Sequence, residues 1–252
     1  MAGVLVIVPF DLQTFTYAAV VVAAAYVVFG ITAFGAALFT VPILSHMLPL
    51  DFVLPMCVLL DVSASLALGV RFSREADKAE LKWMVPTSLI GAILGVTLLV
   101  SLPPQATLVA MGAFLVAYGA WSLRQGAQGG RIGQGWAPVA GLTGGVFGTL
   151  FGIGAPPYAI YLSRRITDLL SYRATLSNMV IFSVSIRALV FAATGLMLAD
   201  RLIGFATLVP FALAGLWLGN RIQGRFSRAT MLRFVAVILL LIGVSLVARA
   251  MS

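Results

Sequence analysis

Apolar runs of about 20 residues, each long enough to cross a bilayer as a helix, recur along nearly the whole chain and constrain its fold more than any other feature. Charged residues make up only 10% of the 252 residues, against about 25% in soluble domains. The mean hydropathy is +1.08. These values predict an all-α polytopic membrane protein in which no soluble domain remains to be placed.

Two of the apolar regions are interrupted by residues that cannot continue a regular helix. The stretch from Phe147 to Pro157, FGTLFGIGAPP, contains three glycines and two adjacent prolines. The earlier stretch from Phe29 to Pro42, FGITAFGAALFTVP, has the same spaced Phe-Gly pairs and a following proline. Matching breaks in two halves of an apolar chain are typical of a transport site at mid-membrane, where broken helices expose backbone groups to a solute.

The two halves are predicted to be repeats joined by a linker at residues 126–135. Each repeat is expected to contain one broken hairpin followed by three spans. The first repeat, residues 1–125, has its hairpin at 12–48 and its spans at 52–70, 84–102 and 107–123. The second, residues 136–252, has its hairpin at 136–163 and its spans at 174–198, 203–220 and 231–248.

Direct alignment of the halves supports an internal duplication. The segment MVPTSLIGAILG from Met84 aligns without gaps on LVPFALAGLWLG from Leu208. The alignment places Gly91 opposite Gly215, and both segments contain a Gly-x-x-x-Gly pattern. Small residues at this spacing let membrane helices approach closely, so these glycines are predicted to lie in helix contacts.

The basic residues predict how the segments cross the membrane, because Lys and Arg accumulate in cytoplasmic loops. If the segment at 136–163 enters the bilayer and returns to the same face, 13 of the 16 basic residues lie inside. Its length as helix, about 42 Å, is too short for two crossings, so each leg should reach about halfway. One hairpin plus three spans then carries the chain across in opposite directions in the two halves, which predicts inverted repeats.

The hairpin tips are the expected site for an anion. A helix that begins inside the membrane presents free N–H groups and the positive end of its dipole. Gly152 and Gly154 would let the backbone approach a solute, and Pro156 and Pro157 fit the first turn of the outgoing helix. Gly35 is the candidate in the first hairpin. The alternative is that these residues only form a tightly packed tip.

Arg187 is the most informative single residue, because it lies 13 residues after Ala174 and 11 before Leu198. At that depth its side chain cannot easily reach either surface, and a charge there is functional by default. Its planar guanidinium suits a carboxylate, phosphate or sulfonate group. Asp61 lies at a similar depth in the first half, as a proton carrier or as a structural ion-pair partner of Arg187. Tyr158 is a further candidate for substrate binding. Hydroxyl or amide donors could come from Ser63, Ser65, Ser183, Ser185 and Asn178, of which Ser63, Ser185 and Asn178 are preferred.

Other functional classes lack a sequence signature. No nucleotide-binding loop, hydrolase motif or Cys/His metal cluster is present, so no enzymatic activity, catalytic residue, cofactor or metal is expected. The net charge of +8 is accounted for by loop topology, which removes nucleic acid as a partner.

Three features of the chain resemble the TauE/SafE family of sulfite exporters, the TSUP-type membrane transporters. They are FGITAFGAALFTVPIL, FGTLFGIGAPPYAIYL with a following Arg173-Ala-Thr-Leu, and the repeated P-x4-G-x3-G helices. The resemblance covers nearly the whole chain, and its most specific part contains Gly152, Gly154, Pro156 and Pro157. Ala36 and Ala37 depart from the glycine-richer pattern of the family in the first half.

The resemblance implies a secondary transporter, an exporter of sulfite, sulfoacetate or a related sulfonate across the bacterial inner membrane. The anion would be held at mid-membrane by the hairpin helix ends and Arg187. A passive anion channel and a carboxylate transporter are alternatives, and a non-transporting membrane scaffold is the alternative from a different class. The expected partners are the small anion, the lipid bilayer and a second copy of the chain in a homodimer.

Overall fold

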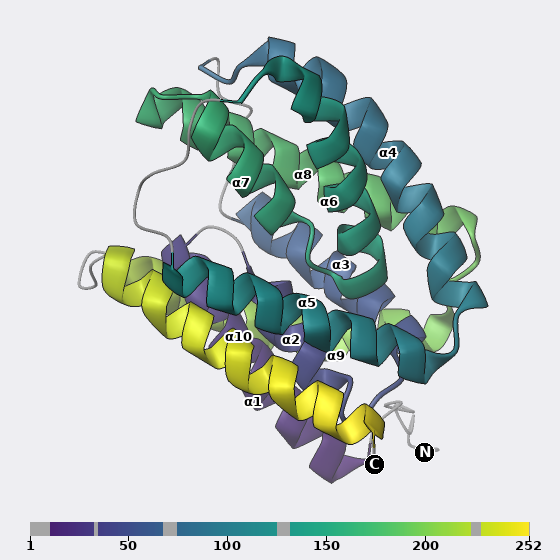
Figure 1. Cartoon of the computed structure of the whole chain (residues 1–252). Helices are drawn as coiled ribbons and strands as arrows, with labels where there is room; N and C mark the ends of the chain where they lie inside the picture. Colours follow the sequence, from purple (N-terminus) through teal and green to yellow (C-terminus); the bar gives the residue numbers. More distant parts are fainter. Residues whose placement is uncertain (1–10, 33–34, 68–74, 125–131, 223–227, 252) are drawn as a thin grey trace.

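A computed structural model describes residues 11–32, 35–67, 75–124, 132–222 and 228–251, and in these residues the secondary structure is helical (Figure 1). The elements are α1 (Leu12–Thr32), α2 (Ala36–Leu44), α3 (Leu50–Ala67), α4 (Lys78–Ser101), α5 (Pro104–Arg124), a 3-10 turn (Gln134–Trp136), α6 (Ala137–Phe151), α7 (Ala155–Arg165), α8 (Leu169–Ala193), α9 (Ala199–Ile222) and α10 (Arg228–Met251). Six of these helices, α1, α3, α4, α5, α8 and α9, are long and apolar enough to cross a membrane. The prediction of an all-α polytopic membrane protein is confirmed. Most of the expected linker at 126–135 lies outside the described residues.

Two capping carboxylates and one glycine explain where the spans begin and end. The Asp77 side chain accepts hydrogen bonds from the first turn of α4, and Asp168 accepts one from the backbone N–H of Ser171 in α8. Both helices therefore begin before the spans expected from hydropathy. The helix α8 ends at Ala193, earlier than expected, because Gly195 adopts a positive φ of 73° and the next N–H turns back to the Phe191 carbonyl.

The two broken segments are each a pair of helices, but their legs differ in length. The helices α6 and α7 have 15 and 11 residues, or about 22 and 16 Å, so neither crosses a hydrocarbon core about 30 Å thick. In the first pair α2 has 9 residues, whereas α1 has 21 and is long enough to span. Half-crossing legs were expected of the hairpin at 136–163 only; the longer segment at 12–48 had room for a longer leg, and α1 is one.

Each half packs a long helix against a hairpin helix of the other half, an arrangement called exchanged packing below. The helix α4 of the first half lies against α6 of the second, and α9 of the second lies against α1 of the first. Figure 1 shows α4 beside α6. A Cβ added to Gly91 would lie 2.2 Å from the Leu142 carbonyl oxygen, and one added to Gly215 would lie 2.2 Å from that of Ala23. The predicted role of these aligned glycines in close helix contact is confirmed.

The last helix of each half, α5 and α10, forms a further contact between the halves. A Cβ added to Gly112 would approach the Gly243 carbonyl oxygen to 2.9 Å, and one added to Gly119 would approach that of Ala236 to 3.0 Å. Because the residue numbers increase along α5 as they decrease along α10, the two helices run antiparallel (Figure 1).

We expect Gly91→Ala to destabilise the protein. The added methyl group meets backbone rather than a mobile side chain, so α4 and α6 must separate, and overpacking of this kind costs about 1–3 kcal/mol. Thermal unfolding in detergent measures the effect. Gly133→Ala is the control, because Gly133 has an ordinary φ of −73° and nothing lies within 4 Å of an added Cβ. Equal melting temperatures for the two variants would contradict the packing assignment.

Candidate functional site

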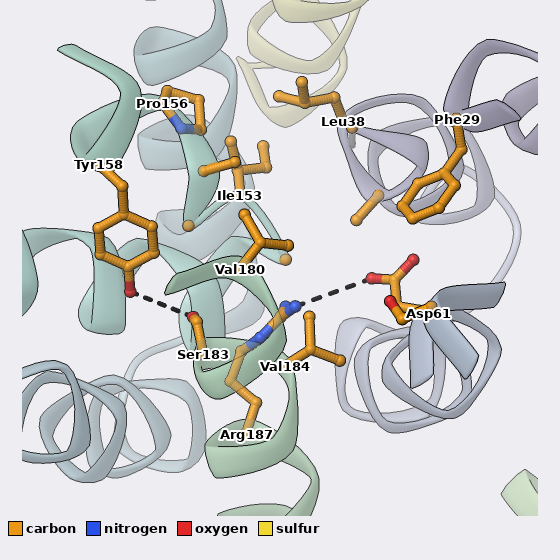
Figure 2. A pocket seen from close by; sticks show the side chains of 16 residues that line it. Phe29, Leu38, Asp61, Ile153, Pro156, Tyr158, Val180, Ser183, Val184 and Arg187 are labelled. Carbon is orange, nitrogen blue, oxygen red and sulfur yellow. Dashed lines mark hydrogen bonds and ion pairs between the residues drawn. The ribbon is translucent and has the colours of Figure 1, made fainter. Parts of the chain in front are cut away.

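A small cavity lies where the two hairpin tips meet α3 and α8 (Figure 2). It offers about 40 Å³ to water, room for roughly three water molecules or one small oxyanion at 10–15 Å³ per water. Most of the residues predicted from the sequence line it: Gly35, Asp61, Gly152, Gly154, Pro156, Tyr158 and Arg187. Phe29, Ser65, Val180, Ser183 and Val184 also line it.

The tip of the second hairpin contacts α2 of the first through Gly152. Its φ of 76° ends α6, a conformation that glycine adopts without steric cost. A Cβ added at Gly152 would lie 2.8 Å from a methyl carbon of Val41 and 3.4 Å from Ala37, both on α2 of the first hairpin. The tip of the second hairpin is therefore seated directly against the leg of the first.

The N-terminus of α7 faces the cavity with few free amides. Gly154 is its N-cap and makes no side-chain capping bond, and Ala155 is the first helical residue. Pro156 and Pro157 follow and carry no N–H, so two of the four groups normally left unpaired at a helix start are absent. The backbone at this end therefore offers an anion few N–H donors. A cationic side chain has to supply most of the contacts to an anion here.

Arg187 of α8 supplies that cation and is only 5% exposed. Its Nη1 donates a 2.8 Å hydrogen bond to the Gly148 carbonyl oxygen. That carbonyl is free because α6 breaks: the N–H of Gly152, which would bond to it in a continuous helix, bonds to Phe147 instead. The Nε of Arg187 is buried without a partner. The break in α6 thus creates the acceptor that holds the guanidinium at the cavity.

Asp61 of α3 faces Arg187 across the cavity and is 6% exposed. Its Oδ2 lies 3.7 Å from Arg187 Nη2, an ion pair longer than a hydrogen bond. Its Oδ1 accepts a 2.8 Å hydrogen bond from the hydroxyl of Tyr26 on α1. The ion pair expected as the structural alternative is therefore present, but its length leaves the guanidinium open to another partner.

The remaining predicted residues are placed differently. Tyr158 is fully buried and donates a 3.1 Å hydrogen bond to Ser183 at the cavity (Figure 2). The Ser63 hydroxyl donates to the Leu59 carbonyl of its own helix, and Ser185 is exposed. Neither lines the cavity, and nor do Pro157 and Asn178, although Asn178 is buried with an unpartnered Oδ1.

Helical spacing explains which of the polar residues on α3 and α8 line the cavity and which do not. Along α8, Val180, Ser183, Val184 and Arg187 line the cavity at i, i+3, i+4 and i+7. Ser185, two residues from Arg187, must point elsewhere, and Ser63 has the same relation to Asp61. The spacing favours Ser65 and Ser183 over their neighbours. Sequence reasoning missed Tyr26 and Gly148, the partners of the two charges, because an aromatic and a glycine inside apolar helices look like ordinary packing.

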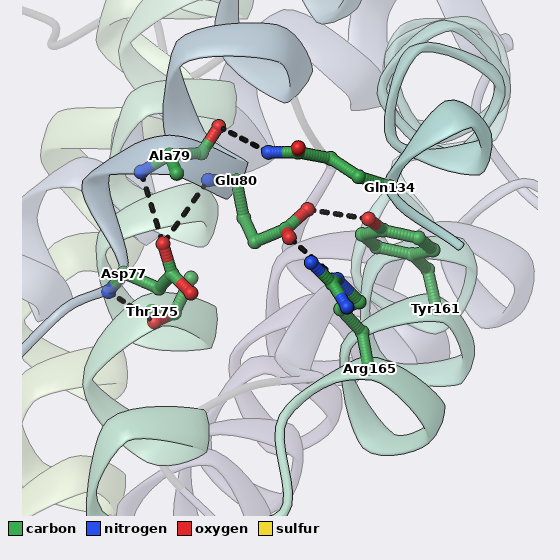
Figure 3. Close-up of polar contacts among 7 residues, drawn as sticks. All are labelled: Asp77, Ala79, Glu80, Gln134, Tyr161, Arg165 and Thr175. Atoms are coloured by element: carbon green, nitrogen blue, oxygen red, sulfur yellow. Dashed lines mark hydrogen bonds and ion pairs between the residues drawn. The ribbon is translucent and has the colours of Figure 1, made fainter. Parts of the chain in front are cut away.

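A second polar cluster ties the far end of α7 to α4 (Figure 3). Glu80 of α4 is completely buried and accepts a hydrogen bond from the Tyr161 hydroxyl and a 2.8 Å bond from Arg165 Nε. Next to it the Asp77 backbone N–H donates to the Thr175 hydroxyl of α8 at 2.8 Å. The short leg α7 is therefore held at both ends, by the cavity residues and by this cluster.

Comparison with known proteins gives the class of this chain, a multi-pass membrane transporter. The family described as sulfite exporter TauE/SafE matches residues 17–246. A relative from Comamonas testosteroni, described as probable inner membrane transporter protein TsaS, is 30% identical over 192 residues, covering 75% of this chain and 80% of that protein. No solved structure was found to match the chain.

The chain belongs to the TauE/SafE family. Members of this family are transporters and not enzymes, and the chain is accordingly a multi-pass transporter of the inner membrane. Among the described residues, no three His, Cys, Asp or Glu side chains are grouped to hold a metal ion.

Gly152→Ala should destabilise the protein more than Gly195→Ala. Both glycines have a positive φ, 76° and 73°, so the backbone strain of roughly 1–2 kcal/mol is shared. Only the Gly152 variant also places its methyl group against Val41, whereas nothing lies within 4 Å at Gly195. Melting temperatures in detergent measure the difference, and equal losses would show that the tips do not press on each other.

Removing the Glu80 carboxylate should loosen α7. We expect Glu80→Ala to lower stability by about 1–3 kcal/mol, because hydrogen bonds to a charged group contribute roughly that amount and Tyr161 loses its partner. A double variant with Arg165→Ala should cost little more than Glu80→Ala alone, since the two side chains share one interaction. Fully additive losses in thermal unfolding would contradict the cluster.

Proposed function

We propose that this transporter is an exporter of a small sulfur oxyanion, with sulfite or sulfoacetate as the preferred substrate, and that Arg187 is the central ligand of the anion. One observation carries the proposal: a permanently charged guanidinium, buried in the membrane part of the chain, borders a cavity of oxyanion size between two hairpin tips. Such a charge is costly unless it serves binding.

The chemistry of the cavity favours an oxyanion over a neutral or cationic solute. The guanidinium cannot deprotonate and offers several N–H donors, one of which is unpartnered in Nε. Hydroxyl groups of Ser65 and Ser183 lie on the same walls and can donate further hydrogen bonds. The family description names sulfite, which places sulfur oxyanions ahead of carboxylates of similar size.

The proposal includes inverted repeats as the basis of alternating access. Two packing features support it. The equivalent helices α4 and α9 each lie against the hairpin helix of the other half, and the equivalent helices α5 and α10 run antiparallel. Antiparallel equivalents are what opposite insertion of two repeats requires. The basic residues around α7, at the start of α4 and at the end of α9 would then lie on the cytoplasmic side.

Flux and binding measurements test this function. Reconstituted protein should transport labelled sulfite, and Arg187→Ala should weaken sulfite binding by about 10- to 100-fold, because a hydrogen bond to a charged group contributes roughly 1.5–3 kcal/mol. Arg187→Lys should retain only part of the affinity, since a point charge replaces a planar fork. Arg173→Ala is the matched control, because Arg173 is exposed at the start of the same helix.

Three outcomes would overturn the proposal in different ways. Unchanged affinity in Arg187→Ala would remove the residue from the site. Absence of flux for sulfite, sulfoacetate and acetate alike would favour a scaffold. Flux that cannot be driven by an ion or proton gradient would favour a passive anion channel.

A further inference from the structure

We propose that Asp61 and the transported anion are alternative partners of Arg187, that a proton on Asp61 decides between them, and that anion and proton therefore move in the same direction. This inference rests on the proposed function. It assigns Asp61 as the proton carrier and Tyr26 as the residue that positions it.

The contacts of Arg187 distinguish a fixed partner from an exchangeable one. Its Nη1 is bonded to the Gly148 carbonyl at 2.8 Å, whereas its Nη2 only approaches Asp61 Oδ2, at 3.7 Å. Both charged side chains border the cavity. An anion entering the cavity can therefore replace the carboxylate at Nη2 without disturbing the bond that orients the guanidinium.

Charge balance requires the exchange to involve a proton. With the cavity empty, the Arg187 cation and the Asp61 carboxylate sum to zero. A monovalent anion, such as the hydrogen sulfite form of sulfite, would bring the buried site to −1, which is costly in a medium of low dielectric constant. If Asp61 takes up a proton as the anion binds, the loaded site is again neutral. The two neutral forms, empty and doubly loaded, are the ones that can change access, which defines electroneutral symport of one proton with each monovalent anion. Export then runs down the outward gradient of the anion and carries one proton out with each anion.

Tyr26 determines where the proton goes. Its hydroxyl donates to Asp61 Oδ1, so the oxygen that faces Arg187, Oδ2, is the one left to accept the proton. Tyr26 is 1% exposed and comes from α1, so it couples the first hairpin to the state of Asp61. Tyr26 does not line the cavity and is bonded to Asp61, so it acts on the site through Asp61.

The other groups around Asp61 leave it as the one carboxylate at the described part of this site. Cys57 lies one turn earlier on α3, and Tyr158 and Ser183 lie on the α7 and α8 walls. The helices α2 and α6 contribute no titratable side chain. Of the helix α9, which also packs on α3, the buried Arg201 is paired with Asp51 and Asp200.

Binding of sulfite as a function of pH tests the competition. Asp61→Asn keeps the shape and the acceptor for Tyr26 but cannot ionise, so it mimics the protonated residue. The ratio of the sulfite Kd of the wild type to that of Asp61→Asn should rise with pH, because only the wild type regains a competing carboxylate. Ionisation of sulfite itself affects both proteins equally and cancels in the ratio.

Transport by the same variant gives an independent readout. In proteoliposomes, Asp61→Asn should exchange labelled for unlabelled sulfite, yet an imposed pH gradient should no longer drive net accumulation. Tyr26→Phe should move the pH at which the Kd ratio rises to higher values, because the carboxylate loses a donor and holds its proton longer. Tyr17→Phe, at an exposed position of the same helix, should behave as the wild type.

The results separate this inference from the proposed function. A Kd ratio that does not vary with pH, or gradient-driven accumulation by Asp61→Asn, overturns proton competition while leaving anion transport intact. Failure of both the wild type and Asp61→Asn to bind sulfite overturns the proposed function and this inference together. A pH-dependent ratio with exchange retained and net flux lost supports it.

Discussion

The hydrogen bond from Arg187 to the Gly148 carbonyl is the interaction on which the site depends. A guanidinium in the interior of a membrane protein needs acceptors there, and most carbonyls of a continuous helix are already bonded to an N–H of the same helix. The break at Gly152 releases one of them. The irregular backbone of the second hairpin and the buried cation therefore require each other, and the cavity lies where the two meet.

Close packing of glycine-containing helices holds this arrangement in place. The hairpin helices α6 and α1 are each pressed against a long helix of the other half, at distances that leave no room for a Cβ. The tip itself is fixed by Val41 on one side, and α7 is anchored at its far end by Glu80. A site that must discriminate among small anions gains from such rigid walls, because its hydrogen-bond donors keep their positions when it is empty.

Much of this could be predicted from the sequence, for identifiable reasons. The length of the apolar runs and the helix-breaking residues predicted the helical class and both interruptions. The mid-span positions of Arg187 and Asp61 predicted that both belong to a buried site, and both line the cavity. The choice among serines could have used helical spacing, which favours Ser65 and Ser183 over Ser63 and Ser185. Two features could not be predicted: the pairing of Tyr26 with Asp61 and the use of the Gly148 carbonyl. Each depends on which helices become neighbours, and local pattern does not contain that information.

The exchanged packing has a consequence for how the protein is made. The glycine face of α4 packs against α6, which is synthesised later. The helix α1 packs against α9, which is synthesised later still. The glycine faces of α1 and α4 have their partners in the second half, so they stay without these contacts until α6 and α9 are inserted. The close packing between the halves is therefore completed only late in synthesis, once α6 and α9 are in the membrane.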